Sequence, residues 1–151
     1  MQARDLPPGK YRYGAVDPGD RIRTGTATVT VEAIDAFAAL TGDRFVIHVD
    51  EAAARARGFD GRVAHGLLVL SLVDGLKNQT PAQFDAIASL GWDWRFAAPV
   101  IAGDTIGATI TVTAKRMTSR PDRGILTLDV SVRTGDGREV QRGTNQLMVA
   151  C

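Results

Sequence analysis

Residues 65–77 read HGLLVLSLVDGLK, and this apolar run decides the architecture of the chain. From Gly66 to about Lys77 it has the length and composition of a helix, whose leucines and valines point in almost every direction. A helix that is apolar on nearly all sides is buried. The sequence therefore predicts a central helix that other elements must enclose.

The second half of the chain supplies strands that can enclose this helix. Apolar and polar residues alternate in several segments, and Gly-, Pro- and Asp-containing turn signals separate the later ones. The predicted strands lie near residues 92–96, 106–114, 126–132 and 139–149, with turns at 120–124 and 135–137. Long strands with one apolar face form an antiparallel sheet with one side on the core. We therefore predict an α+β fold in which an antiparallel sheet wraps around the buried helix.

A sheet of this kind leaves free edges, and a second subunit is a natural way to cover one of them. The N-terminal half is expected to add little to the sheet. Residues 1–25 are rich in Gly, Pro and charge and are predicted to be a covering segment with little regular structure. A short strand is predicted over Thr26–Val31, and Thr30 can then cap a helix that runs through Leu40.

Composition bounds the class of protein. The 151 residues fit one domain, 1–151, and 44% hydrophobic with 23% charged residues is typical of a soluble protein. Eighteen basic residues face 17 acidic ones, so neither nucleic acid nor an anionic membrane is an expected partner. With one cysteine, no signal-peptide core at the start and no stretch of about 18 apolar residues, a cytoplasmic setting without membrane insertion is expected.

The candidate acid/base residues lie in a loop, GDRFVIHV, between the first helix and a second one predicted over Glu51–Arg57 with Asp50 as its cap. The chain has only two histidines, and His48 follows Asp43 by five residues in this loop. A carboxylate and an imidazole that reach one water molecule can divide base and acid work between them. Because Asp/His pairs are common in loops, the spacing alone favours a solvated loop acid and a structural histidine bonded to the backbone.

The second histidine, His65, stands beside Gly66 at the start of the central helix. The first amides of a helix are free donors at the positive end of its dipole, and glycine lets a ligand approach the backbone closely. The Gly66 N–H is therefore a candidate donor to a thioester oxygen that becomes negative as an enolate forms. A tight turn into the helix, with His65 as a cap or a packing residue, remains the alternative.

Other polar and aromatic side chains are predicted to be structural. Asp74 lies in the buried helix and needs a partner or a cavity, of which a structural hydrogen bond is the favoured choice. Trp92, Trp94 and Phe96 are expected to pack in the core rather than to contact an acyl chain. Cys151 is terminal, where a nucleophile would lack a fixed partner.

At this point a resemblance to a known family adds to the residue pattern. Residues 37–76, FAALTGDRFVIHVDEAAARARGFDGRVAHGLLVLSLVDGL, resemble the MaoC-like, or (R)-specific enoyl-CoA hydratase, family of the hot-dog fold. Residues 95–106, RFAAPVIAGDTI, resemble the second signature of the family, so the resemblance covers most of the chain from about residue 20 onward. It implies a helix wrapped by an antiparallel sheet, a homodimer or higher homo-oligomer, and a site near the subunit interface.

The resemblance also implies roles for individual residues. Asp43 and His48 match the catalytic pair, Gly66 matches the oxyanion-hole glycine, and His65 beside it is expected to contact the substrate. Many members have Asn-Pro between the Asp and the His, whereas this chain has Phe45 and Val46, which are expected to shape the substrate pocket. This arrangement is closer to the hydratase-like domain of bifunctional phenylacetate-pathway ring-opening proteins.

The predicted function is that of an enoyl-CoA hydratase or 3-hydroxyacyl-CoA dehydratase, a hydro-lyase of the kind used in fatty acid metabolism. The expected substrate is an acyl-CoA or acyl carrier protein thioester, and no metal or other cofactor is expected. Three alternatives stay open: a hot-dog acyl-CoA thioesterase, a non-catalytic acyl-thioester binding module, and a metal site built from Asp43, His48 and His65, although their spacing matches no recognised zinc pattern.

Overall fold

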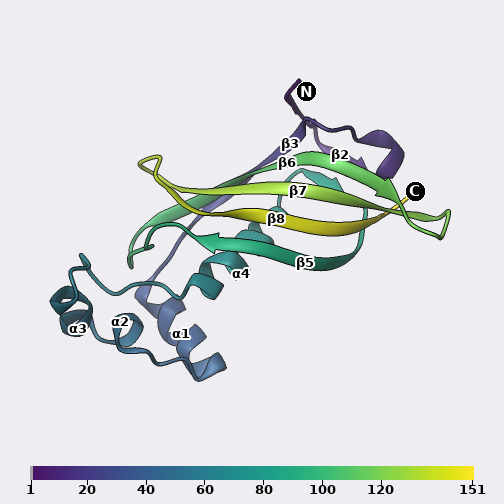
Figure 1. Ribbon diagram of the computed structural model, residues 1–151. Coiled ribbons are helices and arrows are strands. Elements are labelled where there is room, and N and C mark those ends of the chain that lie inside the picture. Colours follow the sequence, from purple (N-terminus) through teal and green to yellow (C-terminus); the bar gives the residue numbers. More distant parts are fainter. Residues whose placement is uncertain (1) are drawn as a thin grey trace.

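The computed structural model describes residues 2–151, in which a curved sheet wraps around helix α4 (Gly66–Lys77) (Figure 1). Within these residues the main sheet has six strands in the order β1-β3-β6-β7-β8-β5, all pairs antiparallel except β1 with β3. Its strands are β1 (Arg4–Asp5), β3 (Asp20–Thr28), β5 (Ala86–Phe96), β6 (Thr105–Met117), β7 (Arg123–Thr134) and β8 (Glu139–Ala150). A small parallel pair joins β2 (Gly9–Tyr11) to β4 (Ala82–Phe84).

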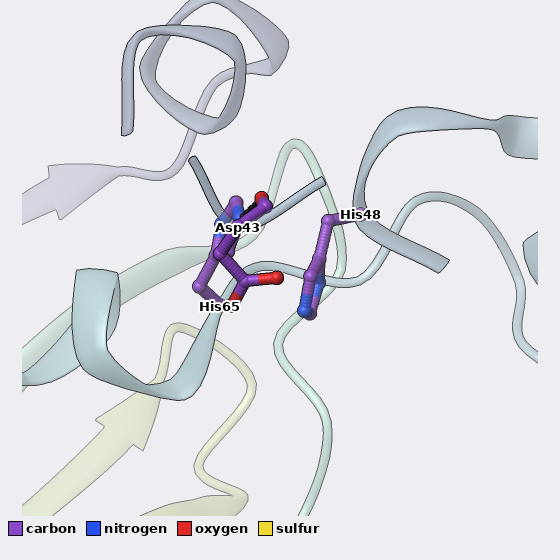
Figure 2. Close-up of side chains that lie close together, drawn as sticks. All are labelled: Asp43, His48 and His65. Atoms are coloured by element: carbon purple, nitrogen blue, oxygen red, sulfur yellow. Dashed lines mark hydrogen bonds between the residues drawn. The ribbon is translucent and has the colours of Figure 1, made fainter. Parts of the chain in front are cut away.

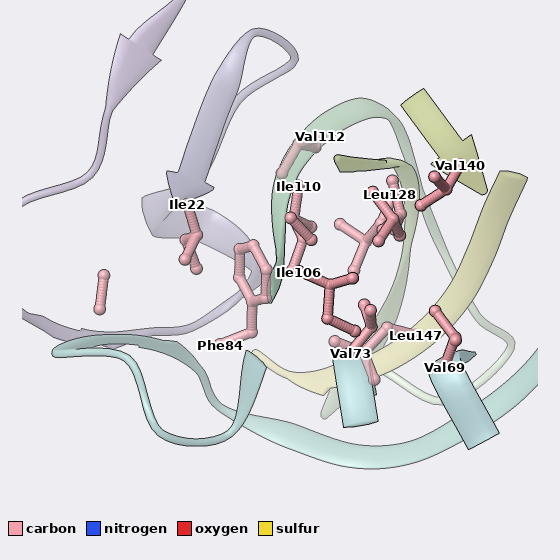
Figure 3. Packing of buried hydrophobic residues seen from close by; sticks show 14 of the residues in the cluster. Ile22, Val69, Val73, Phe84, Ile106, Ile110, Val112, Leu128, Val140 and Leu147 are labelled. Atoms are coloured by element: carbon pink, nitrogen blue, oxygen red, sulfur yellow. The ribbon is translucent and has the colours of Figure 1, made fainter. Parts of the chain in front are cut away.

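The core lies between α4 and the concave face of the sheet. Val69 and Val73 of α4 meet Leu128, Val140 and Leu147 of β7 and β8 in one cluster of buried apolar residues (Figure 3). The predicted central helix, its bounds and the wrapping sheet are therefore confirmed. The prediction of burial on nearly all sides of α4 is wrong in one respect, because Leu67 is 60% exposed.

The N-terminal segment is more regular than its composition indicated. The prediction of little regular structure over residues 1–25 is wrong, because β1, β2, a 3-10 turn (Tyr13–Ala15) and most of β3 lie there. Strand β3 pairs with β6 in register Ile22↔Ile110, and a partner strand can impose a strand on a charge-rich sequence. The strand ends at Thr28, and Val31, expected to end it, is instead the first residue of α1.

Three helices, α1 (Val31–Thr41), α2 (Val46–Val49) and α3 (Glu51–Ala56), gather at the end of the sheet where α4 begins (Figure 1). The predicted caps are confirmed, since Thr30 Oγ1 accepts from Ala33 N–H at 3.0 Å and Asp50 Oδ1 accepts from Ala53 N–H at 3.0 Å. The short α2 lies inside the segment predicted to be a loop. No helix in residues 2–151 has the length and apolar character needed to cross a bilayer.

One edge of the main sheet is open. Strand β5 pairs with β8 on one side, and no strand among residues 2–151 pairs with its other side. Ile87 and Leu90 of β5 are 44% and 48% exposed. A long, partly apolar edge of this kind is what the sequence predicted a second subunit would cover.

Candidate active site

A short segment before α4, residues 63–64, connects the elements that carry the candidate residues. Val63 N–H donates to the Ile47 carbonyl at 2.9 Å, and Ala64 N–H donates to the Val100 carbonyl at 2.8 Å. The segment is thus tied to α2 on one side and to the loop after β5 on the other. These bonds place α2, which carries His48, beside the start of α4.

His48 is buried, with 9% of its surface exposed, and the backbone fixes its ring. Its Nδ1 lies 2.6 Å from the Val63 carbonyl oxygen. A carbonyl oxygen only accepts, so we assign the ring hydrogen to Nδ1, which leaves Nε2 as an acceptor in the neutral ring. Arg62 Nε donates to the His48 carbonyl at 2.6 Å, while the Arg62 guanidinium pairs with Asp35 on α1. The backbone-bonded alternative is thus confirmed for Nδ1 of His48, and a catalytic role for its Nε2 stays a prediction.

Asp43 lies just after α1, and local bonds orient it. Its backbone N–H donates to Thr41 Oγ1 at 3.2 Å, and its Oδ1 accepts from Phe45 N–H at 3.2 Å. Its backbone carbonyl accepts from His65 Nε2 at 2.9 Å. Figure 2 shows the Asp43 carboxyl group next to His65, with an oxygen directed toward the His48 ring.

His65 is 2% exposed and stacks on His48, with ring centroids 4.0 Å apart and an interplanar angle of 27°. In the neutral ring, donation by Nε2 to the Asp43 carbonyl leaves Nδ1 as an acceptor, and no residue in the described part of the chain donates to it. The structure therefore gives His65 a role in holding Asp43 in place. Direct contact of His65 with the substrate stays a prediction.

The same geometry bears on the metal alternative. Potential ligand atoms of Asp43, His48 and His65 lie within 4.8 Å of one another. An imidazole nitrogen binds a metal in the plane of its ring at about 2.0–2.1 Å. Two nearly parallel rings stacked 4.0 Å apart do not direct their lone pairs to one such point. The residues present thus do not fit a shared ion bound by both histidines.

The three side chains meet Gly66 at a cavity of about 480 Å³, within the size range of small-molecule sites. The rest of its wall is mainly apolar: Val63, Ala64, Leu67, Val69, Phe96, Ala97, Ala98, Pro99 and Val100, with the amide of Gln141. A Cβ on Gly66 would lie 2.5 Å from the Phe96 ring, so any larger residue here would require that ring to move. The Gly66 N–H belongs to the first turn of α4 and has no partner within that helix.

Phe45 and Val46, which were expected to shape the substrate pocket, do not line this cavity in the described structure. Phe45 is 52% exposed, lies edge-on to His48 at 5.9 Å between ring centroids, and has the Arg57 guanidinium 5.5 Å from its ring centre. Val46 begins α2 and is 39% exposed. Their expected contact with a substrate stays a prediction.

Two polar residues complete the comparison with the sequence predictions. Asp74 Oδ1 forms an ion pair with Lys77 Nζ at 2.9 Å on the same helix, which is a structural contact but not the predicted hydrogen bond. Gln141 on β8 lines the cavity and was missed. The sequence carried a signal for it. Gln141 and Asn145 are polar, yet they lie on the same buried face of β8 as Leu147 and Val149.

Comparison with known proteins identifies the family. A family model described as the MaoC like domain matches residues 14–134. Protein MaoC of Klebsiella aerogenes is 36% identical over 117 residues, which are 77% of this chain but only 34% of that protein, so the chain spans about a third of its length. The (R)-specific enoyl-CoA hydratase of Aeromonas caviae is 36% identical over 104 residues, covering 69% of this chain and 74% of that enzyme.

Solved structures show the same architecture. A monoamine oxidase regulatory protein from Archaeoglobus matches with a TM-score of 0.86 and 30% identity over 99% of this chain and 98% of that one. The (R)-hydratase from A. caviae matches with a TM-score of 0.73 and 31% identity, over 88% of this chain and 96% of that one. A Mycobacterium tuberculosis protein described as a double hot-dog fold matches at a TM-score of 0.83 and 21% identity, over 97% of this chain and 46% of that one, which shows the fold alone. The predicted family and fold are confirmed: this chain belongs to the MaoC-like family of hot-dog proteins, whose named relatives include hydro-lyases.

Proposed function

We propose that this chain adds water reversibly to the double bond of a 2-enoyl thioester, giving a 3-hydroxyacyl thioester. The observation that carries the proposal is that Asp43, His48 and the first amides of α4 share one largely apolar cavity. The names of the relatives supply the reaction class, and the A. caviae enzyme is named as (R)-specific, so we propose the (R)-3-hydroxy product.

The proposed reaction assigns one task to each of these groups. A water molecule binds between the Asp43 carboxylate and Nε2 of His48. Its oxygen attacks Cβ, and the electrons of the double bond move through Cα to the thioester oxygen, which accepts a hydrogen bond from Gly66 N–H. The Asp43–His48 pair takes one proton from the water and returns one to Cα, so that its own charge is restored after each turnover. Dehydration is the reverse of these steps.

The carrier and the assembly belong to the same proposal. The thioester is that of coenzyme A or of an acyl carrier protein, and the pair needs no metal or redox cofactor for these proton transfers. We propose a homodimer formed along the open edge of β5, as the exposed Ile87 and Leu90 favour. The expected cytoplasmic setting stays a prediction.

The test compares the unchanged protein with Asp43→Asn on 2-enoyl-CoA substrates of several chain lengths. We expect the unchanged protein to hydrate the substrate, measured as loss of the enoyl absorbance without release of thiol. For the variant we expect kcat to fall about 10²–10⁴-fold. Asp60→Asn is the matched control, because Asp60 is an exposed acid close in sequence to the site that does not line the cavity. Chiral analysis of the product checks the (R) assignment.

Each alternative gives a distinct result in the same assay. Release of free thiol would identify a thioesterase. Binding of the thioester without turnover, unaffected by Asp43→Asn, would identify a binding module. Full hydratase activity in folded Asp43→Asn would remove Asp43 from the mechanism.

A further inference from the structure

A buried amide joins the sheet to the first turn of the central helix. Gln141 lies on the concave face of β8, is 2% exposed and lines the same cavity as Gly66. Its Nε2 donates to the Gly66 carbonyl oxygen at 3.1 Å. Sequence separation across this bond is 75 residues, so only the folded chain brings the two together.

A second bond decides which way the amide of Gln141 points. Trp94 Nε1 on β5 donates to Gln141 Oε1 at 2.8 Å. An indole N–H can only donate, so it must face the oxygen of the amide and not its nitrogen. The Gln141 Nε2 is thereby turned toward Gly66. Trp94, Gln141 and Gly66 thus form a bonded series from β5 through β8 to α4.

Holding the Gly66 carbonyl in place also orients the first peptide unit of α4. Because the peptide unit is planar and trans, fixing the Gly66 carbonyl also fixes the Leu67 N–H, which points the opposite way, out of the helix start. The preceding residue is held as well, since the His65 ring is bonded to the Asp43 carbonyl at 2.9 Å. Glycine itself has the least restricted backbone of any residue. The Gly66 N–H therefore lies between two fixed points. On one side is the His65 ring, bonded to Asp43, and on the helix side is the Gly66 carbonyl, bonded to Gln141.

We propose that Gln141, oriented by Trp94, is a positioning residue that aims the first amides of α4 at the thioester oxygen. This inference rests on the proposed function and deepens it. Gln141 acts through the Gly66–Leu67 peptide and takes no part in proton transfer. The same cavity wall includes apolar Val69 and Phe96, which offer a misplaced peptide no hydrogen bond.

The kinetic test uses Gln141→Met, which keeps the length of the side chain and removes both hydrogen bonds. A misdirected donor at a site of charge development costs rate rather than ground-state binding, so we expect kcat to fall about 10–100-fold with KM changed less than about 3-fold. Trp94→Phe should lower kcat in the same way, because the amide is then free to turn. The double variant should be no slower than Gln141→Met alone, since both changes break one series.

The matched control is Asn145→Leu. Asn145 is the other fully buried amide on β8, also bonds to β5 through Ser89 Oγ and the Gly91 carbonyl at 2.9 Å each, and does not line the cavity. It should lower the unfolding temperature yet leave kcat per folded molecule within about 2-fold. Equal kcat losses in Asn145→Leu and Gln141→Met would show that Gln141 is merely structural and would overturn the proposal, as would additive losses in the double variant.

A second readout needs no turnover and separates this inference from the proposed reaction. In ¹⁵N-glycine-labelled protein with assigned resonances, a saturated acyl-CoA, which cannot be hydrated, should shift the Gly66 amide signal. In Gln141→Met the signal should already be displaced without ligand and should respond less to it, while that of Gly58 stays unchanged. If no thioester is hydrated but Gly66 behaves in this way, the reaction is wrong and the positioning role stands. An unchanged Gly66 signal in Gln141→Met overturns the positioning role even in an active hydratase.

Discussion

Both histidines of the candidate site are held by backbone carbonyl oxygens rather than by acidic side chains. His48 Nδ1 is bonded to the Val63 carbonyl and His65 Nε2 to the Asp43 carbonyl. A carbonyl carries no net charge, so it fixes the tautomer of each ring without adding a negative group to the cavity. The Asp43 carboxylate is thereby left as the acidic side chain at this part of the cavity wall.

Gly66 provides a test at the same scale. In Gly66→Ala the new methyl group would lie 2.5 Å from the Phe96 ring, and since that side chain is 57% exposed, the ring can turn away. We expect the variant to fold but to lose cavity shape, with a fall in kcat/KM of about 10-fold or more. Steady-state kinetics with one enoyl-CoA substrate measures this fall in kcat/KM.

The comparison that decides the cause of this loss is the double variant Gly66→Ala with Phe96→Ala. If crowding by the ring is the cause, the second substitution should recover part of the activity relative to Gly66→Ala alone. No recovery would assign the loss to the glycine backbone instead.

Among the elements, the N-terminal strand β1 pairs with β3 through the backbone, and one buried carboxylate, that of Asp20, adds a side-chain link. Arg4 donates two hydrogen bonds to Asp20, at 2.8 Å and 2.6 Å, and Asp20 also accepts from Asp17 N–H at 2.9 Å. Burial acts to raise the pKa of Asp20, but the hydrogen bonds from Arg4 and from the Asp17 backbone, with the positive charge of Arg4, lower it below its usual value. The covering segment thus depends on an ionised carboxylate.

This lowered pKa predicts how stability changes with pH. A carboxyl group with a lowered pKa in the folded state stabilises the fold above its unfolded pKa of about 3.9, and this contribution is lost as pH falls through the folded pKa. Asp20→Asn should therefore lower the free energy of unfolding by about 1.5–3 kcal/mol near pH 6, and the difference should shrink below about pH 4. Urea unfolding of both proteins across this range checks the prediction; a difference that does not vary with pH would contradict it.

Helix α4 presents one face to the sheet and another to solvent, which predicts unequal effects of substitution. Leu68 is 6% exposed and belongs to the core, so Leu68→Ala should lower the free energy of unfolding by about 2–5 kcal/mol. Ser71 is exposed on the same helix, and Ser71→Ala should change it by no more than about 0.5 kcal/mol. Denaturant unfolding of the two variants measures the contrast, and similar losses would contradict the packing described.

At the scale of the whole molecule, one edge of β5 has no partner strand within the described chain. Its unpaired backbone groups and the exposed Ile87 and Leu90 form a surface that a second copy can cover by strand pairing. Phe96, at the end of the same strand, lines the candidate cavity. Assembly along β5 would therefore bring the second subunit next to the site.

The assembly prediction has a direct test. Sedimentation equilibrium should give about twice the chain mass of 16.1 kDa for the unchanged protein. Leu90→Lys places a charge on the open edge and should shift the population toward monomer. The control Lys10→Ala changes an exposed residue on β2 and should leave the dimer intact. A monomeric unchanged protein at micromolar concentration would contradict the proposed dimer.

Local patterns in the sequence predicted much of this molecule. The long apolar run gave α4 from Gly66 to Lys77, and side-chain caps at Thr30 and Asp50 marked helix starts, because capping involves residues only three apart. The strand starting at Asp20 escaped prediction, since its pairing with β6 joins distant segments. The four-residue α2 was missed because its position depends on the bond between Ile47 and Val63.

The candidate site divides in the same way. By itself the sequence determined the residue types and the central helix, and its family resemblance indicated Asp43, His48 and Gly66, because these depend on neighbours along the chain. Only the tertiary structure decided which nitrogen of His48 is free, that His65 holds Asp43, and that Gln141 reaches Gly66 across 75 positions. Contacts of that kind are set by how the sheet closes over the helix, and no short stretch of sequence contains both partners.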